Sequence, residues 1–507
     1  MNYRLVFRTI RHLKLKQILY QVKNRIYKSN YVHYSAPIRD AKEFVTNPID
    51  RCSSVDKELF TFLNKSHRFS DWNYLDYGPL FAYNQNYFDF INDGVIEKNE
   101  ALRWIDKFIA DIPTITLGMD SYPIALRSIN WVKFFSKYPD VITSLNEDSL
   151  WSQLRLLQKN IEYHLLGNHL LEDSFALYIG GCYFGDTSMI KKSYNLLRKQ
   201  LKEQILQDGS HYEQSPMYHS ILLDRLLDCI NIGSGRLEEV EYLSTYALKM
   251  LGHLSAICYH DGDIPLLNDS ANNIAPTPSQ IFNYAKRLGL NWEFIPMSEC
   301  GYRKLVSDKM EVIVDVGNIT ASYQPGHSHA DTFNYEMRFD GKPFVVDTGI
   351  STYEKNARRQ YERSTAAHNT VSVADKDSSE VWGGFRVGRR ASVKIHEEGQ
   401  DYIVASHNGF AGVKCTRTFQ IDEQGFIVKD DVGPGVKAKS FIHFAPGVEV
   451  MSVEGNIICT SVAEIEIQNA DGVAIVDEYA SVSYNALRPI KKAIISFTGN
   501  LNYKILS

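Results

Sequence analysis

Two patterns of hydrophobic and polar positions follow one another along the chain. Between residues 57 and 290, apolar residues recur at helical intervals of three and four, as in SILLDRLLDCINI at residues 220–232. Turn signals such as QDGS, at residues 207–210, separate these segments. The first pattern therefore predicts several α-helices in series.

After about residue 300 the pattern changes to short runs of alternating or β-branched residues, bounded by Gly, Asp and Asn. The runs are MEVIVDVG (310–317), NITASYQ (318–324), YEMRFDG (335–341), PFVVDTG (343–349), NTVSVAD (369–375), ASVKIHE (391–397), DYIVASHNG (401–409), SFIHFAPG (440–447) and AEIEIQNA (463–470). Many short strands of this kind predict an antiparallel β-sandwich that begins near Tyr302.

The two patterns divide the chain into three predicted parts. Residues 1–56 are expected to form a basic helical extension, residues 57–300 an α-helical domain and residues 301–507 a β-sandwich. A chain of 507 residues is too long for one ordinary core, which agrees with a multidomain α+β protein.

The N-terminal segment MNYRLVFRTIRHLKLKQILYQVKNRIYKSN is basic, and no acidic residue precedes Asp40. Its apolar residues are spaced, so it resembles neither a signal peptide nor a membrane-spanning helix. The residues on one predicted helical face are Leu5, Ile10, Leu13, Ile18, Val22 and Ile26. Packing of this face on its own domain is favoured over a peripheral contact with a membrane surface. Without an export signal, we expect the protein in the cytoplasm or at a membrane, with the periplasm as the alternative.

The amino-acid composition argues against several classes of function. A formal net charge of −5 gives no global basis for nucleic-acid binding. The seven cysteines are dispersed, with no C-x-x-C pair, which argues against a disulfide framework and a thiolate zinc site. Neither observation indicates an oligomeric state.

The segment QPGHSHADTF carries the most suggestive cluster. His327 and His329 are two residues apart, so in an extended segment both rings lie on one face. Asp347 ends the next predicted strand, and His368 precedes another. Two neutral imidazoles and a carboxylate from different strands suit zinc or a similar divalent ion. The alternative is a set of ordinary hydrogen-bonded histidines.

Two further groups lie in the helical half. In GNHLLE, Asn168, His169 and Glu172 share one helical face, where an amide and an imidazole can donate hydrogen bonds to a carboxylate. In DGSHYEQSPMYH, Pro216 suits the first turn of a helix and places Tyr218 near its start. Such a tyrosine either exchanges a proton with a substrate or simply packs on the amphipathic helix.

A third group in the helical half is Arg127, Asn130 and Trp131, in SYPIALRSINWVKF. Their helical spacing presents a cation, an amide and an aromatic ring, a combination that suits a sugar. A core tryptophan with a surface arginine is an equally good interpretation.

Five motifs in a fixed order resemble those of the heparinase II/III-like polysaccharide lyases and their alginate-lyase relatives. They are GNHLLE (167–172), DGSHYEQSPMYH (208–219), GHSHADTFNYEM (326–337), VVDTG (345–349) and RSTAAHNTV (363–371). The resemblance implies an incomplete (α/α) toroid followed by an antiparallel β-sandwich. It also implies an acidic polysaccharide substrate that contains uronic acid and is cleaved by β-elimination.

The resemblance also assigns roles residue by residue. Asn168 and His169 match residues that engage the substrate carboxylate, Tyr218 matches the catalytic tyrosine and His327 a catalytic histidine. Elimination needs the carboxylate charge neutralised, a base at C5 and an acid at the leaving O4. Tyr218 is expected to be the acid, and the base is either His327 or Tyr218 itself.

The metal assignments and an additional tyrosine rest on the same resemblance, whereas Arg127, Asn130 and Trp131 are assigned to substrate binding from their helical spacing. His329, Asp347 and His368 match metal ligands, with zinc expected in a structural role that holds the loop of His327. An additional active-site tyrosine corresponds to either Tyr353 or Tyr361. The residues assigned to substrate binding are Glu172, Arg127, Asn130, Trp131, Tyr212, Tyr353, Tyr361 and Arg363.

Two other functions compete with the lyase hypothesis. One is a non-catalytic glycan-binding or assembly protein of cell-surface polysaccharide synthesis that has the same fold. The other is a metal-dependent glycan hydrolase, in which the metal at His329, Asp347 and His368 activates water.

Overall fold

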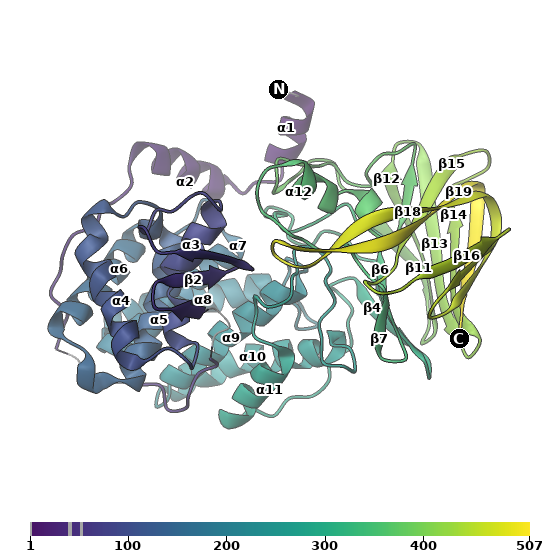
Figure 1. Cartoon of the computed structure of the whole chain (residues 1–507). Helices are drawn as coiled ribbons and strands as arrows, with labels where there is room; N and C mark the ends of the chain where they lie inside the picture. Colours follow the sequence, from purple (N-terminus) through teal and green to yellow (C-terminus); the bar gives the residue numbers. More distant parts are fainter. Residues whose placement is uncertain (1–2, 39–42, 51–53) are drawn as a thin grey trace.

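The computed structural model describes residues 3–38, 43–50 and 54–507. Cys52 lies outside this range. Figure 1 shows a helical half and a β-sheet half side by side, with the N-terminal helices along one edge of the molecule. The last helix of the helical half ends at Arg287 and the first strand of the other half begins at Tyr302.

The helical half is built on one hydrophobic core that runs through all its helices. Its helices are α3 (Pro79–Tyr87), α4 (Lys98–Asp111), α5 (Ser121–Lys137), α6 (Ser144–Lys159), α7 (Gly167–Phe184), α8 (Thr187–Gln204), α9 (Pro216–Ile232), α10 (Leu237–Ile257) and α11 (Pro278–Arg287). The central helix α7 packs against α5, α8 and α9 and is buried over nearly its whole length. The prediction of several helices in series is thus confirmed between residues 79 and 287.

A small antiparallel sheet in the helical half has no counterpart in the sequence prediction. It consists of β1 (Ser54–Asp56), β2 (Leu59–Phe62) and β3 (Lys65–Arg68). Phe60 and Phe62 of β2 pack on Phe90, with ring centroids 5.3 and 6.2 Å away. Burial of these rings fixes the sheet on the helices.

Two helices precede this sheet, α1 (Tyr3–Ile10) and α2 (Leu15–Ile26). They contact both halves of the molecule. Trp382 Nε1 of the β-sheet half donates to Thr9 Oγ1 of α1, and Gln17 Nε2 of α2 donates to Leu165 O of the helical half. Among the described residues, no helix has both the length and the apolar character needed to cross a membrane.

The β half contains a four-stranded sheet in the order β4-β5-β6-β7 and a ten-stranded sheet along β11-β12-β13-β14-β19-β18-β17-β16, with β15 joining β19 to β8. Two strands, β9 (Val381–Trp382) and β10 (Arg386–Val387), pair separately. The remaining bounds are β4 (Tyr302–Val306), β5 (Met310–Asp315), β6 (Tyr335–Phe339), β7 (Lys342–Val345), β8 (Val371–Val373), β11 (Val393–Glu398), β12 (Tyr402–Phe410), β13 (Val413–Asp422), β14 (Gly425–Asp431), β15 (Lys437–His443), β16 (Val450–Glu454), β17 (Ile457–Thr460), β18 (Glu464–Ser483) and β19 (Ala486–Leu506). The paired strands are antiparallel and one apolar core fills the space between the two large sheets, which confirms the sandwich.

One predicted strand is wrong. Residues 318–324, NITASYQ, form a loop, because Ala321 and Tyr323 pack into a small cluster with Leu166 and Tyr212 of the helical half. The tip of the long β18–β19 hairpin makes a second contact between the halves. Asn64 Nδ2, in the turn between β2 and β3, donates to Tyr484 O.

Candidate functional site

A cavity of about 1250 Å³ lies between the two halves of the molecule. The helical half, the β half and helices α1 and α2 all contribute to its wall. The five predicted site residues on this wall are Asn168, His169, Tyr218, His327 and Tyr353. A cavity of this size with convergent polar groups is the usual form of a ligand site.

Asn168 is positioned by the strained start of α7. Leu166 and Gly167 both have positive φ, 63° and 61°, and an added Cβ on Gly167 would lie 2.3 Å from Glu213 Oε1. Glu213 accepts hydrogen bonds from the backbone N of Asn168, at 2.9 Å, and from its Nδ2, at 2.8 Å. Glycine at 167 therefore allows the close approach that holds the Asn168 amide against this carboxylate.

His169 lies next to Asn168 on the cavity wall, with its side chain 30% exposed. Its Nδ1 is 2.9 Å from Glu162 Oε2. Burial opposes the charged form, but the Glu162 carboxylate outweighs this effect and raises the pKa of His169. The Glu162 carboxylate thus shifts the titration of this imidazole in favour of the cationic form.

Tyr218 lies at the start of α9, where Ser215 Oγ accepts from its backbone N. The centroid of the Tyr218 ring lies 4.0 Å from that of the His327 ring, with the two planes tilted by 31°, and the Tyr218 hydroxyl is 3.3 Å from that of Tyr353. Burial raises the pKa of Tyr218 well above its usual range, so the phenol keeps its proton at neutral pH. A neutral phenol next to an imidazole forms an acid–base pair.

Asp269 connects both histidines of the H-S-H segment. Its Oδ2 lies 2.9 Å from His327 Nδ1 and its Oδ1 2.9 Å from His329 Nε2. Burial alone would raise the pKa of Asp269, but the ion pair with Arg359 and the two imidazoles hold it well below the usual range. The ionised carboxylate therefore accepts a hydrogen bond from His327 Nδ1–H, which leaves Nε2 facing Asn168 Nδ2 at 3.2 Å and Glu213 Oε2 at 3.4 Å.

The predicted metal ligands lie behind this wall. His368 Nδ1 is 2.7 Å from Asp347 Oδ2, and the rings of His329 and His368 are 5.3 Å apart. Three buried atoms of this region have no hydrogen-bond partner among the described residues: His329 Nδ1, His368 Nε2 and Asp331 Oδ2. Nitrogen and oxygen atoms of these types can ligate a divalent cation, although with Asp347 they do not form a group of ligand atoms within 4.8 Å of one another among the described residues. Asp331 was not among the predicted ligands.

The prediction that Arg127, Asn130 and Trp131 bind a sugar needs correction. All three are fully buried in the helical core. The Arg127 guanidinium donates to Asn86 O and Gly118 O, each at 2.9 Å, and the Asn130 amide donates to Tyr87 O. The hydrogen bonds of Arg127 and Asn130 hold the helices together, and none of the three side chains is exposed to a ligand.

Four other predicted substrate contacts also lie outside the cavity wall formed by the described residues. Tyr212 donates to Tyr323 Oη, Tyr361 to Glu478, and Arg363 to Ser328 O. Glu172 is buried, with its Oε2 3.5 Å from Arg225 Nε. These side chains support the wall, and of the two candidate tyrosines only Tyr353 reaches the cavity.

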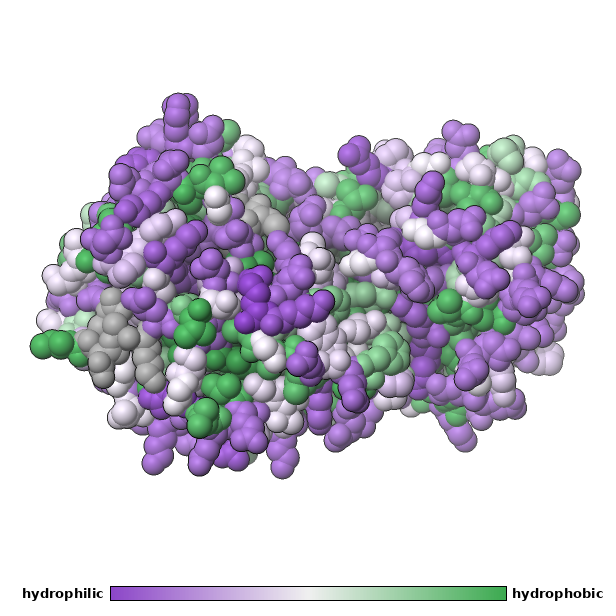
Figure 2. Space-filling model, turned by 90° about the horizontal axis from the view of Figure 1, so that it is seen from below, coloured by the Kyte–Doolittle hydropathy of each residue, from purple (hydrophilic) through white to green (hydrophobic). Residues whose placement is uncertain are grey.

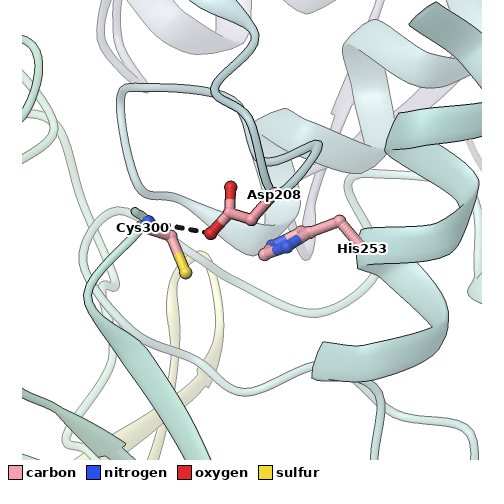
Figure 3. A group of neighbouring side chains, drawn as sticks. All are labelled: Asp208, His253 and Cys300. Carbon is pink, nitrogen blue, oxygen red and sulfur yellow. Dashed lines mark hydrogen bonds between the residues drawn. The ribbon is translucent and has the colours of Figure 1, made fainter. Parts of the chain in front are cut away.

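A separate group of possible ligand atoms lies within 4.8 Å in Asp208, His253 and Cys300 (Figure 3). Asp208 Oδ1 accepts from the backbone N and Oγ of Ser210, and Oδ2 accepts from the backbone N of Ser298 and Cys300, both at 2.9 Å. The carboxylate thus has four hydrogen bonds, its full capacity. Asp208 thus fastens the segment before β4 to the turn after α8, and this structural role explains its buried position.

Sequence reasoning missed the residues that orient the site. Asp269 lies in the loop segment NDSANN, which carries no recognisable motif. Arg359 acts through a contact with Asp269, 90 residues away in the chain, and Glu162 precedes its partner His169 by seven residues without belonging to any of the motifs. Glu213 was visible in DGSHYEQSPMYH, but nothing in its spacing indicated a bond to Asn168.

The fold and site define a two-domain protein with a cavity of about 1250 Å³ between an α-helical domain and a β-sandwich. The model of the heparinase II/III N-terminus matches residues 139–288, and that of the heparinase II/III-like C-terminal region matches residues 290–505. The chain belongs to the heparinase II/III-like family.

Individual relatives are distant. A heparin-sulfate lyase from Bacteroides stercoris is 21% identical over 322 residues, which cover 56% of this chain and 46% of the relative. The chain thus spans about half the length of the curated relatives it matches. A crystal structure of heparinase III superposes with a TM-score of 0.72 at 15% identity, covering 87% of this chain and 80% of the other. A mutant heparan sulfate lyase from Pedobacter heparinus gives a TM-score of 0.60 at 14% identity, covering 97% and 87%. These similarities establish the incomplete toroid and β-sandwich as the fold.

Proposed function

We propose that the protein is a polysaccharide lyase that cleaves an acidic, uronic-acid-containing glycan by β-elimination. The observation that carries the proposal is the pair of Tyr218 and His327, with ring centroids 4.0 Å apart on the cavity wall and with Asn168 and His169 beside it. A base, an acid and two groups for a carboxylate are what this reaction needs.

The geometry favours His327 as base and Tyr218 as acid. Asp269 holds Nδ1 of His327, so Nε2 takes the C5 proton, and the C5–H electrons form a C4=C5 double bond as the C4–O4 bond breaks. Tyr218 gives its proton to the leaving O4. His169 binds the uronate carboxylate, and Asn168 Nδ2 exchanges its 3.2 Å contact with His327 for the same carboxylate.

The residues His329, Asp347 and His368, together with Asp331, are proposed to hold a structural divalent cation, with zinc preferred. The unpartnered buried atoms of His329, His368 and Asp331 support this proposal. A cation there would supply positive charge that ties together the segments carrying His329 and His368. The four residues lie outside the cavity wall of the described chain, which argues against the hydrolase alternative.

Product masses test the reaction type. A purified sample incubated with heparan sulfate, chondroitin sulfate, alginate and hyaluronan is analysed by mass spectrometry. Elimination gives fragments whose masses sum to that of the substrate, whereas hydrolysis adds one water for each cut. Fragments that contain the added water would refute the proposal.

A further inference from the structure

The apolar face of the N-terminal helix pair points away from the protein. On α2, Leu15, Leu19, Val22 and Ile26 are 70%, 58%, 52% and 80% exposed, and Ile18 adds a further 37%. Their spacing of three, four and seven makes one continuous stripe. On α1, Tyr3 and Phe7 are 83% and 70% exposed.

The polar face of α2 packs inward instead. Gln17 is buried, and its Nε2 donates to Leu165 O and Tyr323 O at 3.1 and 3.3 Å. Asn24 Nδ2 contacts His164 Nδ1 at 3.1 Å. An amphipathic helix normally buries its apolar side. Here the hydrogen bonds of the polar side fix the helix in the opposite orientation, so the exposed stripe is not a consequence of loose packing.

Cations surround the stripe. Five basic residues of α1, α2 and the residue after α1 have no carboxylate within 4.0 Å in the described part of the chain: Arg4, Arg11, Lys16, Lys23 and Arg25. Beside α2, a groove of about 400 Å³ is lined by Lys14, Lys16, Lys192 and Lys199, and by Glu203, which pairs with Lys14. An apolar stripe flanked by cations is complementary to the interface of an anionic bilayer.

We propose that α1, α2 and the lysine groove form a docking surface for an anionic membrane. The stripe enters the boundary between headgroups and acyl chains, and the lysines and arginines contact the lipid phosphates. A second copy of the chain fits this face poorly, because a symmetric contact would bring the two sets of cations together.

Docking has a consequence for the cavity. Thr9, Gln21 and Arg25 of the same helices line it, so a docked chain holds the cavity beside the bilayer. Figure 1 shows α1 and α2 along one edge of the molecule, and Figure 2 shows the opposite side, where hydrophilic residues cover most of both halves with apolar residues between them. The proposed docking surface lies along the edge with α1 and α2.

Vesicle co-sedimentation of the full chain tests the proposal, independently of any lyase activity. Vesicles of phosphatidylcholine alone are compared with vesicles in which about one lipid in four is phosphatidylglycerol. We expect binding to the anionic vesicles only, weakened by salt. The double variant Leu19→Glu/Ile26→Glu should lower the affinity about tenfold or more.

A matched control uses two apolar residues of similar exposure on other helices. Leu145 and Leu237 are 54% and 81% exposed, so Leu145→Glu/Leu237→Glu should bind as the unchanged chain does. Equal loss in both double variants, or no binding to anionic vesicles, would overturn the proposal. Concentration-dependent dimerisation that Leu19→Glu/Ile26→Glu abolishes, without vesicle binding, would show that the stripe is an interface between copies.

Discussion

Arg359 and Asp269 form a fully buried, bidentate ion pair between the halves of the molecule, with Nη1–Oδ1 at 2.5 Å and Nη2–Oδ2 at 2.7 Å. Since the same carboxylate holds His327 and His329, this pair sets the positions of the proposed base and of one proposed metal ligand. Orientation of a catalytic imidazole by a buried carboxylate fixes which ring nitrogen faces the substrate.

Asp269→Asn should therefore reduce both stability and catalysis. The change leaves Arg359 buried without a counter-charge, at a cost of about 3–5 kcal/mol in the free energy of unfolding. It also removes the acceptor that fixes Nδ1–H of His327, so kcat should fall about 10²- to 10⁴-fold, with a changed pH profile. Denaturant unfolding and initial-rate kinetics measure the two effects.

The sandwich offers a control for Asp269→Asn. Arg417 and Asp430 form another fully buried pair, at 2.6 Å, in the strands β13 and β14. Asp430→Asn should lower stability to a similar extent but leave kcat per folded molecule unchanged. If both variants lose activity equally, Asp269 has only a structural role.

Gly167→Ala tests the strained start of α7. The added Cβ would meet Glu213 Oε1 at 2.3 Å, and φ is +61°, so we expect a loss of about 2–4 kcal/mol in stability and displacement of Asn168. Gly262→Ala is the matched control, since φ is +89° there and no atom lies within 4 Å of the Cβ. It should cost only about 1–2 kcal/mol and leave kcat unchanged. Equal effects of the two substitutions would contradict the proposed role of the Gly167–Glu213 contact.

The His169–Glu162 pair predicts a pH dependence. The pKa of His169 is raised in the folded protein, so the stabilisation is complete below the unfolded value of about 6.5 and is lost as pH rises through the folded value. Because the side chain is 30% exposed, the contribution is less than about 1 kcal/mol.

Glu162→Gln should lower the pKa of His169 measured by NMR titration. The difference in the free energy of unfolding between Glu162→Gln and the unchanged chain should be largest near pH 6 and shrink as pH rises. The reason is that the unperturbed pKa of histidine is about 6.5. An unchanged His169 titration would contradict this explanation.

Metal content tests the proposed cation. We expect about one equivalent of divalent metal per chain, most stably zinc, and a lower thermal midpoint after chelation. His368→Ala should lose the metal, while His253→Ala, in the separate group with Asp208 and Cys300, should keep it. Elemental analysis measures the content. Metal lost from His253→Ala but not from His368→Ala would place the cation at the other group.

The sequence predicts the class of each half correctly because periodicity reports local structure. It predicts a shared face, however, and not the direction of that face. Ile18, Val22 and Ile26 do share a face, but it points outward, because hydrogen bonds of Gln17 and Asn24 fix the other side. For the same reason, the sequence did not reveal that the helical face carrying Arg127 points into the core.

The spacing of the two histidines in H-S-H illustrates which features of the site could not be predicted from the sequence. His327 and His329 were expected on one face of an extended segment, and they lie in a loop, on either side of the Asp269 carboxylate. Only tertiary folding brings Asp269 and Arg359 to this loop. The motifs therefore identified the groups on the cavity wall but not those that orient them.

The most direct test of the lyase proposal is the ultraviolet absorbance of the unsaturated uronate that elimination leaves. The unchanged chain, Tyr218→Phe and Tyr212→Phe are each incubated with the same panel of acidic polysaccharides. Tyr212 is the matched control, because its hydroxyl bonds Tyr323 at 2.9 Å behind the wall. We predict that absorbance rises for at least one substrate, that Tyr218→Phe slows it about 10²- to 10⁴-fold, and that Tyr212→Phe changes it little. A substrate cleaved without this absorbance, or one that Tyr218→Phe cleaves at the full rate, would contradict the account.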